Sequence, residues 1–491
     1  MKHGMRPLRF LLNQQLRELA DVDPTLTVLE WLRGPAGLTG TKEGCAEGDC
    51  GACTVVLGTP AADGNMRYRA VNSCIAFVPM LDGRQLLTVE HLKSADGRLH
   101  PVQQAMVDHH GSQCGFCTPG FVMSLFALYL TESRPTRDRV NDVLSGNLCR
   151  CTGYRPIVDA AQAMYDTAWD EPVLAHAAQT AKRLLELRKD SEPLALEHKG
   201  RRYFAPMRAD QLDALLAAHP KATLLAGGTD VGLWVTKLHR DLGDVIYLGN
   251  VAELHGIDDR GEELVIGAAV THADAYDVIA REFPDFGELL RRFGSTLVRN
   301  SSTVGGNVAN GSPIGDSMPA LIALGARVVL RGPNGEREIP LEDLYIAYGK
   351  QSRKPGEYVV RLRIPKLAQG EQFHCYKLSK RFDQDISAVC AAFKLRAENG
   401  RVGEIRTGFG GIAAIPARAR KTEAALTGQP WNEATITHAE CVLGDEFTPL
   451  TDMRASRDYR RLATTRLLRK FFIETTQPDA RTRVLDAEVC A

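Results

Sequence analysis

Three cysteines stand close together in the stretch Cys45-Ala-Glu-Gly-Asp-Cys50-Gly-Ala-Cys53, and a fourth, Cys74, follows further along the chain. Four thiolates at this spacing are the ligands that a plant-type [2Fe–2S] cluster uses. The alternatives are a set of buried thiols and a zinc site. Buried thiols do not gather at C-x4-C-x2-C, and zinc sites favour paired C-x2–4-C knuckles. The spacing therefore favours an iron–sulfur cluster, and a chain that carries one moves electrons.

Glycines accompany these cysteines at Gly44, Gly48 and Gly51. In a cluster loop each thiolate must reach iron, and backbone N–H groups must approach the bridging sulfides. A Cβ atom would crowd that approach, whereas glycine leaves the space open. The glycines support the same interpretation of the first cysteine block.

A second cysteine block reads Cys114-Gly-Phe-Cys117 and continues at Cys149-Arg-Cys151. On spacing alone, a C-x2-C pair with a distant C-x-C pair is compatible with a zinc site as well as with a second cluster. The block upstream favours the second cluster, because an electron relay accounts for both blocks whereas a structural zinc accounts for only one.

Residues typical of a helix start follow each half of the second block. Thr118-Pro119 comes directly after the first pair of cysteines, and Thr152, with Pro156 beyond it, comes directly after the second pair. A capping hydroxyl with a proline in or near the first turn predicts that both pairs lie at helix N-termini. Free N–H groups and the positive end of the helix dipole would stabilise a net-negative cluster there.

The bulk composition excludes several functional classes. The 491 residues contain 60 Lys and Arg and 60 Asp and Glu, so no global field attracts nucleic acid or an anionic membrane. The longest strongly apolar run, from Phe121 to Leu130, is interrupted by Ser124 and is too short to span a bilayer. We expect no secretory signal and a cytoplasmic location, where clustered cysteines indicate metal ligation rather than disulfides. The isolated cysteines are expected to be packed or incidental thiols: Cys375, Cys390, Cys441 and Cys490.

Composition and periodicity divide the chain into four domains and a connector. Residues 5–90 mix strands with one helix, residues 91–165 have a helical pattern, and residues 166–200 form a connector around a helix rich in Ala, Leu and Lys. Two α+β domains follow at 201–371 and 372–478. The expected strands are 8–12, 53–57, 86–89, 245–248, 264–266, 328–330, 373–377 and 388–395. The expected helices are 27–33, 102–107, 121–130, 157–164 and 433–441.

Two glycine-rich loops stand out in the first of these α+β domains. One reads Leu224-Leu225-Ala226-Gly227-Gly228-Thr229-Asp230-Val231, with a strand before the turn and a helix from about Val231; the other runs from Ser301 to Asp316. Such loops present backbone N–H groups and hydroxyls to phosphate oxygens, although plain turn chemistry accounts for either loop alone. Two of them downstream of cluster sites favour a dinucleotide. Flavin is the best candidate, because it couples one-electron clusters to two-electron hydride chemistry.

The order of these motifs resembles the iron–sulfur and flavin portion of xanthine dehydrogenase and its molybdenum hydroxylase relatives, from about Leu8 to Phe472. The resemblance implies a multidomain α+β fold. Its parts would be a β-grasp [2Fe–2S] ferredoxin domain, a four-helix [2Fe–2S] domain, a FAD domain of the vanillyl-alcohol-oxidase type and a C-terminal domain like that of the carbon monoxide dehydrogenase flavoprotein. The cysteine motifs carry the resemblance most specifically.

The resemblance also implies roles for individual residues. The cluster nearer the flavin would be held by Cys45, Cys50, Cys53 and Cys74, and the cluster nearer the molybdenum by Cys114, Cys117, Cys149 and Cys151. The loop from Leu224 to Val231 would wrap the FAD pyrophosphate. Further flavin contacts would be Phe293, Thr303, Gly306, Asn307, Asp316, Lys377 and Asp385, and Tyr348 would lie near the nicotinamide site.

The chain differs from the family pattern in one respect: no residue on it matches the molybdopterin half that hydroxylates a purine. The resemblance therefore implies a small subunit that needs a molybdopterin-binding large subunit, in an (αβ)2 assembly. It would relay electrons through two [2Fe–2S] clusters to FAD and then NAD during hypoxanthine or xanthine oxidation. One alternative is the same subunit of an aldehyde or other N-heterocycle hydroxylase. Another is a non-enzymatic electron carrier or cofactor-assembly factor.

Overall fold

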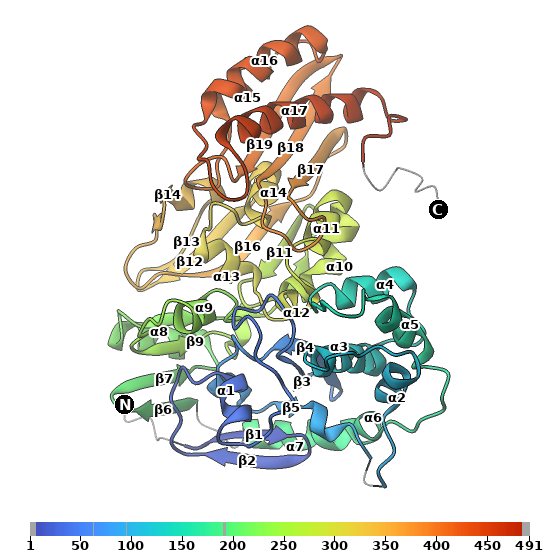
Figure 1. Cartoon of the computed structure of the whole chain (residues 1–491). Coiled ribbons are helices and arrows are strands. Elements are labelled where there is room, and N and C mark those ends of the chain that lie inside the picture. The colour runs from blue at the N-terminus through green and yellow to red at the C-terminus, as the bar shows by residue number, and fades with distance from the viewer. Residues whose placement is uncertain (1–5, 62, 95, 190–192, 484–491) are drawn as a thin grey trace. The chain divides into compact units, whose positions relative to one another are not determined.

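The computed structural model describes residues 6–61, 63–94, 96–189 and 193–483 (Figure 1). The chain divides into two units. The first takes Met1–Leu254, Thr271–Ala273 and Gly294–Thr303, and the second takes His255–Val270, Asp274–Phe293 and Val304–Ala491. Both cysteine blocks and the first glycine loop belong to the first unit. Within the described residues, no helix is long and apolar enough to cross a membrane.

The first unit begins with a five-stranded sheet in the order β2-β1-β5-β3-β4. Its strands are β1 (Leu8–Leu12), β2 (Gln15–Leu19), β3 (Thr54–Pro60), β4 (Met66–Asn72) and β5 (Gln85–Leu87). Helix α1 (Val28–Arg33) starts at a capping box, in which Thr27 and Glu30 bind each other's backbone N–H groups. The Phe10 and Trp31 rings pack edge to face at 5.3 Å and fix α1 to the sheet.

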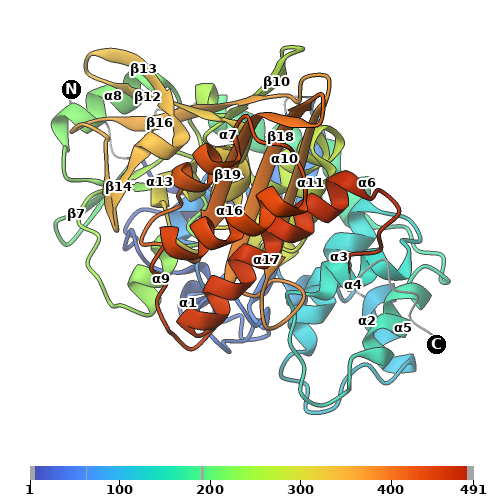
Figure 2. The same ribbon diagram turned by 90° about the horizontal axis from the view of Figure 1, so that it is seen from above.

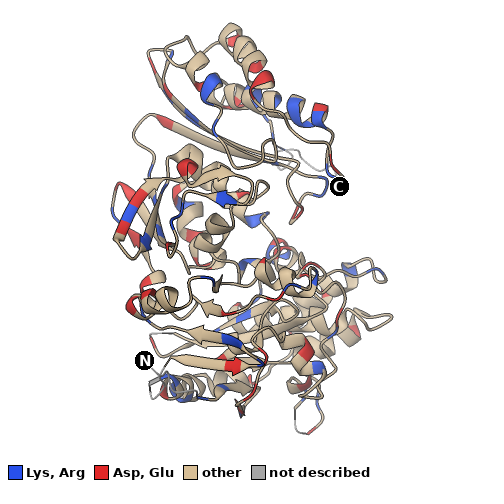
Figure 3. Cartoon of the chain, turned by 90° about the vertical axis from the view of Figure 1, so that its left-hand side faces the viewer, with Lys and Arg blue, Asp and Glu red and all other residues tan. Residues whose placement is uncertain are grey.

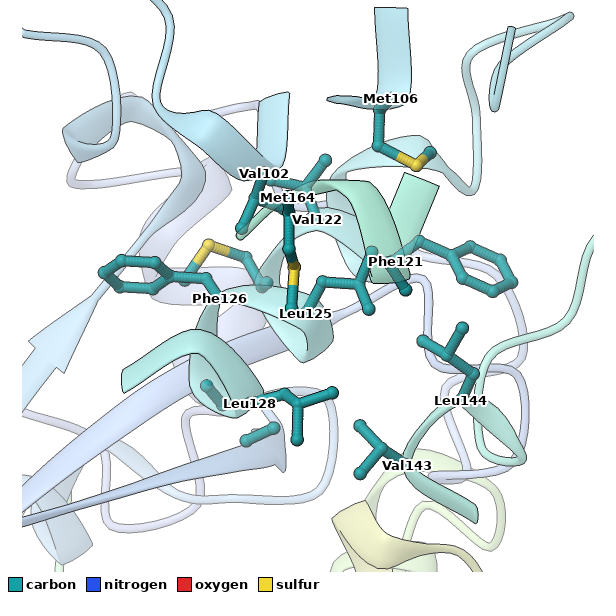
Figure 4. Close-up of a cluster of buried hydrophobic side chains, with 14 of the residues drawn as sticks. Val102, Met106, Phe121, Val122, Leu125, Phe126, Leu128, Val143, Leu144 and Met164 are labelled. Carbon is teal, nitrogen blue, oxygen red and sulfur yellow. The ribbon is translucent and has the colours of Figure 1, made fainter. Parts of the chain in front are cut away.

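Four helices follow: α2 (Pro101–Asp108), α3 (Thr118–Thr131), α4 (Arg137–Leu144) and α5 (Arg155–Ala163). Helix α3 is buried on nearly every side because it contacts α2 and α4 as well as strands β3 and β4. Its side chains Phe121, Leu125 and Phe126 lie at the centre of a hydrophobic cluster to which Val102 and Met164 also contribute (Figure 4). This cluster holds the second cysteine block in place.

The expected connector contains helices α6 (Pro172–Ala175) and α7 (Ala177–Lys189), the second of which is the predicted helix rich in Ala, Leu and Lys. Ala181 and Leu184 are fully buried where α7 packs on β3 and β4. Before these helices, His100 caps α2 and its Nε2 lies 2.8 Å from Glu171, which caps α6. The segment is therefore part of the first unit's packed interior.

The rest of the first unit is a sheet in the order β6-β7-β9-β8. It comprises β6 (Leu194–His198), β7 (Arg201–Ala205), β8 (Thr223–Leu225) and β9 (Val245–Tyr247), with helices α8 (Ala209–Ala218), α9 (Val231–Thr236) and α12 (Thr296–Arg299). Strands β7, β9 and β8 are parallel, so helices connect them, and the first glycine loop lies between β8 and α9. The strand, turn and helix expected at that loop are confirmed.

The second unit contains an antiparallel sheet in the order β10-β11-β16-β12-β13. Its strands are β10 (Ile257–Asp259), β11 (Glu263–Gly267), β12 (Arg327–Gly332), β13 (Gly335–Pro340) and β16 (Tyr358–Pro365). Figure 3 shows charges of both signs along these strands, and Arg363 pairs with Glu263 at 2.8 Å and with Glu338 at 2.9 Å. A hairpin of β14 (Tyr345–Ala347) and β15 (Lys350–Gln351) and the helices α11 (Pro284–Arg291), α13 (Val304–Asn310) and α14 (Ser317–Leu324) complete this part. Helix α10 (His272–Glu282) belongs to it from Asp274 onward, and its first two residues belong to the first unit.

The last part of the second unit is a three-stranded sheet covered by helices. The strands are β17 (Glu371–Leu378), β18 (Val389–Glu398) and β19 (Arg401–Gly410), and the helices are α15 (Arg420–Leu426), α16 (Glu433–Glu446) and α17 (Arg457–Thr476). These helices lie side by side across the strands (Figure 2). Phe393 of β18 stacks on Phe471 of α17 at 5.1 Å. The long helix α17 was not predicted from the sequence.

Candidate functional site

The thiols of the first cysteine block meet in two pairs. Cys53 Sγ and Cys74 Sγ lie 3.3 Å apart, and both side chains are buried. Cys45 and Cys50 are half-buried, and the backbone N–H of each donates to the sulfur of the other at 3.3 Å. A side-chain hydrogen bond between Cys45 and Cys74 joins the pairs. Two pairs of thiolates fit a cluster of two irons, because each iron takes two of the four cysteines.

Backbone and side-chain donors point at these sulfur atoms. The N–H groups of Glu47 and Asp49 each donate to Cys45 Sγ at 3.4 Å, and Asn72 Nδ2 donates to Cys53 Sγ at 3.7 Å. The thiols of Cys50 and Cys74 lower the pKa of Cys45, and the backbone N–H groups of Cys50 and Glu47 add to the effect. Hydrogen bonds to sulfur stabilise a thiolate and tune the potential of a cluster bound to it.

Glycines make the close packing of this loop possible. A Cβ on Gly44 would lie 2.7 Å from Cys50 Sγ, so a side chain there would enter the space of the sulfur. Gly48 and Gly51 have φ of +80° and +69°, which side chains rarely adopt. The three glycines therefore fit the role that the sequence predicts for them, and Gly51 has a second role that involves the other cysteine block.

The thiols of the second block also meet in two pairs, each made of one cysteine from either half. Cys117 lies close to Cys149, and Cys114 lies close enough to Cys151 to raise the pKa of Cys151. Cys149 is buried, whereas Cys114 and Cys151 are exposed. Burial raises the pKa of Cys117 to about 12, and the nearby Cys149 adds to this shift.

Cys149 receives the most hydrogen bonds among the thiols of this block. The N–H groups of Cys151 and Thr152 donate to its sulfur at 3.4 and 3.5 Å, and the Thr152 hydroxyl lies 3.3 Å away. Although burial acts to raise its pKa, the bonds from Thr152 and Cys151 lower the pKa of Cys149 to about 7. Cys149 is thus the thiol of this block whose surroundings stabilise negative charge on sulfur.

The predicted helix caps at this block are wrong in detail. Helix α3 does begin at Thr118, but Cys117 is the residue that precedes it, and the Thr118 hydroxyl binds Ser112 at 2.7 Å instead of capping the helix. Helix α5 begins only at Arg155, because Tyr154 before it has φ of +69°. The Thr152 hydroxyl accepts a hydrogen bond from the Tyr154 N–H at 3.1 Å, and this bond forms a turn inside the loop. The first cysteine pair therefore lies at a helix start, and the second lies in the loop ahead of one.

The two cysteine blocks touch each other inside the first unit. The N–H of Leu148 donates to the carbonyl oxygen of Cys50 at 3.0 Å. A Cβ on Gly51 would lie 2.3 Å from the carbonyl oxygen of Gly146, and a Cβ on Gly120 would lie 2.3 Å from that of Gly51. We name Gly51, Gly120 and Gly146 the glycine junction. It brings the two loops to backbone contact.

The first glycine loop packs against two other segments of the same unit. A Cβ on Gly227 would lie 1.9 Å from the carbonyl oxygen of Ser301, so this loop and the residues just before Thr303 are in backbone contact. A Cβ on Gly228 or on Gly232 of α9 would lie 3.0 or 2.7 Å from the carbonyl oxygen of Ile75. Ile75 follows Cys74 directly. The predicted flavin loop therefore adjoins the first cysteine block.

The remaining residues of that loop are arranged as a tight turn. Gly228 has φ of +77°, and the N–H of Gly232 donates to its carbonyl oxygen at 2.7 Å. Burial raises the pKa of Asp230, whereas a hydrogen bond with Trp234 acts to lower it. A pyrophosphate binds to a loop with few side chains, because the backbone N–H groups must come close to its oxygen atoms. The residues present therefore fit the flavin that the sequence predicts.

Other predicted flavin residues belong to the second unit. Gly306 and Asn307 lie on α13, Asp316 precedes α14, and Phe293 follows α11. The Asn307 side chain binds the hydroxyl of Ser317, which places it beside Asp316. The helices α13 and α14 thus bring Asn307 and Asp316 together.

Asp316 and Lys377 form a buried ion pair in this unit. Lys377 Nζ lies 2.5 Å from Asp316 Oδ2, and Ser387 Oγ donates to Asp316 Oδ1 at 2.5 Å. The two residues are 3% and 6% exposed. Lys377 Nζ also lies 3.4 Å from the carbonyl oxygen of Arg292, next to Phe293. The pair therefore connects the start of α14 with the sheet of the last domain.

The last two predicted residues are more open. Tyr348, at the tip of the β14–β15 hairpin, is 76% exposed. Asp385 accepts from the N–H groups of Arg381 and Ile386 at 2.9 and 3.0 Å, which shapes the turn between β17 and β18. Of the isolated cysteines, Cys375 and Cys390 are buried, Cys441 is exposed, and Cys490 lies outside the described residues.

Sequence reasoning missed several residues of the site. Gly120 and Gly146 supply backbone surfaces on which the loop of the first cysteine block rests. Asn147 and Ser124 form a buried hydrogen bond between the two cysteine blocks. A signal for Ser124 was present, since it is the one serine inside the apolar run from Phe121 to Leu130. The others become visible only when segments far apart in sequence are brought together.

Four family models match the chain in succession. They are a 2Fe-2S iron–sulfur cluster binding domain (residues 10–79), a [2Fe-2S] binding domain (88–162), a FAD binding domain in molybdopterin dehydrogenase (197–367) and a CO dehydrogenase flavoprotein C-terminal domain (374–475). The predicted fold class, with its four parts in this order, is confirmed.

Similar curated proteins include xanthine dehydrogenase of Emericella nidulans, 32% identical over 99% of this chain and 40% of that protein. Xanthine dehydrogenase/oxidase of Gallus gallus is 28% identical over 96% of this chain and 40% of that protein. The chain thus spans about 40% of the length of these relatives.

Two solved structures match a little over half of the chain. A carbon monoxide dehydrogenase chain from Hydrogenophaga pseudoflava is 29% identical with a TM-score of 0.52, over 55% of this chain and 94% of that one. A quinoline 2-oxidoreductase chain from Pseudomonas putida 86 is 25% identical with a TM-score of 0.51, over 56% and 96%. Both are similar in sequence as well as in fold.

Proposed function

We propose that this chain, an iron–sulfur and FAD-binding module of a molybdenum hydroxylase of the xanthine dehydrogenase family, relays electrons from a partner that carries a molybdenum cofactor to FAD and on to NAD. One observation carries the proposal. A single unit holds two groups of four thiols and a flavin-type loop in sequence, with backbone contact at each step: Leu148 with Cys50, and Ile75 with Gly228 and Gly232.

The residues that we propose for each group are those that the motifs of the chain indicate. The first [2Fe–2S] cluster would bind Cys45, Cys50, Cys53 and Cys74, and the second would bind Cys114, Cys117, Cys149 and Cys151. FAD would contact the loop from Leu224 to Val231, Phe293, Thr303, Gly306, Asn307, Asp316, Lys377 and Asp385, with Tyr348 near the nicotinamide. When bound, the clusters supply one-electron steps and the flavin couples them to hydride transfer.

The chain's own residues contribute position, charge and exclusion of water. Burial of Cys53 and Cys74 keeps solvent from the first site, and the N–H groups of Glu47 and Asp49 stabilise negative charge on Cys45. The exposed Cys114 and Cys151 place the second site at the surface of its unit. This difference in exposure supports electron flow from the second site to the first, because the site that receives electrons from a partner must be accessible at the surface.

The finer identity is also part of the proposal. Relatives about 30% identical are named xanthine dehydrogenases, which supports hypoxanthine and xanthine as substrates of the complete enzyme and NAD as acceptor. Purine hydroxylation itself would take place on a molybdopterin-binding large subunit, and an (αβ)2 assembly is expected. The similarity to quinoline 2-oxidoreductase favours a second candidate, in which the partner oxidises another N-heterocycle or an aldehyde.

The first experiment is a visible absorption spectrum of the full chain purified without oxygen, with iron, sulfide, zinc and flavin measured on the same sample. We expect flavin bands over an iron–sulfur envelope and about four irons per chain, the content of two [2Fe–2S] sites. Zinc in place of iron at the second block, or a chain without flavin, would contradict the relay.

A second assay separates the relay from a non-enzymatic carrier or an assembly factor. NADH oxidation with an artificial electron acceptor needs only the flavin and its nicotinamide site, so the chain should turn over without its partner. A carrier or assembly factor would show no such turnover. Addition of a large subunit, tested with xanthine, quinoline and an aldehyde in turn, then decides the substrate class.

A further inference from the structure

A buried polar group lies between the two cysteine blocks. Asn147 Nδ2 donates to the carbonyl oxygen of Gly51 at 3.1 Å and lies 3.3 Å from the hydroxyl of Thr54. Asn147 Oδ1 accepts from the hydroxyl of Ser124 on α3 at 2.7 Å. Asn147, Ser124 and Thr54 are 2%, 0% and 1% exposed. One amide therefore binds the loop of the first block, strand β3 and helix α3 at once.

One other hydrogen bond joins the two loops here, from the backbone N–H of Leu148 to the carbonyl oxygen of Cys50 at 3.0 Å, and Asn147 adds the side-chain link. Gly51, Gly120 and Gly146 meet there through backbone atoms alone, as described for the glycine junction. Two backbone segments that touch only by van der Waals contact can shift along each other, whereas hydrogen bonds from one side chain to both segments hold them at a fixed distance. Asn147 also stands two positions before Cys149, and Gly51 directly follows Cys50. A shift of the amide would therefore move a cysteine of either block.

We propose that Asn147, held by Ser124, is a positioning residue that fixes the separation of the two [2Fe–2S] sites. The inference rests on the proposed function, because it takes both blocks to hold clusters. Three of the four hydrogen-bonding positions of the amide are used: the carbonyl accepts one hydrogen bond, from Ser124, and the NH2 group donates to the Gly51 carbonyl and to the Thr54 hydroxyl. A buried amide whose partners are all satisfied holds one geometry, and removal of a partner leaves the others without compensation.

Two substitutions of Asn147 test whether its hydrogen bonds, or only the volume that its side chain fills, set the separation of the two cluster sites. Asn147→Ala removes the amide and leaves the Gly51 carbonyl and the Ser124 hydroxyl without it. Asn147→Asp keeps the shape but places an oxygen where NH2 faced the Gly51 carbonyl, so attraction becomes repulsion. Ser124→Ala removes only the group that orients Asn147 and should have a weaker effect. Asn72→Ala is the matched control, because it deletes a buried amide that binds Cys53 Sγ and lies outside the junction.

The experiment is electron paramagnetic resonance of the full chain after reduction of both sites, with iron measured on every sample. Two reduced clusters interact magnetically, and the interaction falls steeply with their distance. We expect Asn147→Ala and Asn147→Asp to retain about four irons and to change the splitting seen in the parent. Asn72→Ala should shift the first cluster's midpoint potential and leave the splitting unchanged.

Several outcomes would overturn the inference. Unchanged splitting in both Asn147 variants would show that the junction holds its spacing without the amide. Loss of half the iron in both variants, with Ser124→Ala fully loaded, would make Asn147 an assembly residue and not a spacer. A parent chain without two reducible clusters would instead refute the proposed function, and this sample is measured first.

Discussion

The backbone N–H of Leu148 donates a hydrogen bond of 3.0 Å to the carbonyl oxygen of Cys50. Leu148 directly precedes Cys149, so one bond links a cysteine of the first block to the residue next to a cysteine of the second. A bond of this kind contributes about 0.5–1.5 kcal/mol net. Substitution of the Leu148 side chain leaves it intact, since only main-chain atoms take part. The two cysteine sites are therefore parts of one folded unit.

Replacement of one cysteine from either block should remove one cluster and leave the other. For Cys149→Ser we expect about two irons per chain, because a [2Fe–2S] site that loses a thiolate ligand loses its iron pair. Iron analysis and the reduced paramagnetic spectrum measure this directly. Cys441→Ser is the control, since Cys441 is exposed and distant in sequence from both blocks, and it should keep about four irons. Full iron in Cys149→Ser would show that another residue is the ligand.

Gly227→Ala should release FAD without loss of iron. The new Cβ would lie 1.9 Å from the carbonyl oxygen of Ser301, a distance that backbone atoms cannot accept, so the first flavin loop must move away from the residues before Thr303. Flavin absorbance and NADH turnover are expected to fall together. Gly256→Ala is a matched control, because a Cβ there meets nothing within 4 Å. Retained flavin in Gly227→Ala would remove this loop from the FAD site.

The ion pair of Asp316 and Lys377 should stabilise the second unit as well as shape the flavin site. Lys377→Met leaves a carboxylate that is 3% exposed, with Ser387 as its remaining partner, and loss of one member of a buried pair costs about 3–5 kcal/mol. The free energy of unfolding in urea measures the effect. The double variant Asp316→Asn with Lys377→Met should recover much of it, since no unpaired charge remains. An unchanged free energy together with lost FAD would assign both residues to the cofactor alone.

The predictions from the sequence were most accurate where the residues of a site lie close together in the chain. The spacing of Cys45, Cys50 and Cys53 lies within one loop, and the structure brings these thiols together with Cys74 as that spacing suggests. The turn at Gly227 and Gly228 is equally local, and its strand and helix were found as expected. The predicted cap at Thr118 was wrong because the Thr118 hydroxyl binds Ser112 instead of the helix backbone. The helix-start pattern in the sequence does not predict this contact.

The parts that could not be predicted depend on contacts between distant segments. Asn147 looks like an ordinary loop residue until Gly51 and Ser124 are placed beside it. Helix α17 was missed because its buried positions, among them Leu468 and Phe471, form a narrow stripe among arginines. Several of those arginines bind carboxylates elsewhere in the second unit, such as Arg469 with Glu440. Such pairing exists only once the fold is formed.

Acid should destabilise the first unit through His272. This side chain is fully buried, and burial, together with the nearby positive Arg299, lowers its pKa from 6.5 to about 4. Between these values the unfolded chain binds a proton that the folded chain excludes, so stability is complete above about pH 6.5 and declines as the pH falls towards 4. The loss from this residue reaches about 2 kcal/mol at pH 5. Since Ser302, which binds His272 at 2.9 Å, adjoins Thr303, flavin should also dissociate more readily in acid.

The variant His272→Gln isolates this contribution from the carboxylates that titrate in the same range. Unfolding free energies at pH 7.5 and pH 5 should differ by about 2 kcal/mol less in the variant than in the parent, because glutamine takes up no proton. His438→Gln, at an exposed position on α16, should match the parent at both pH values. Equal pH dependence in His272→Gln and the parent would mean that His272 takes up its proton over the same pH range in the folded and the unfolded chain, so that burial does not lower its pKa.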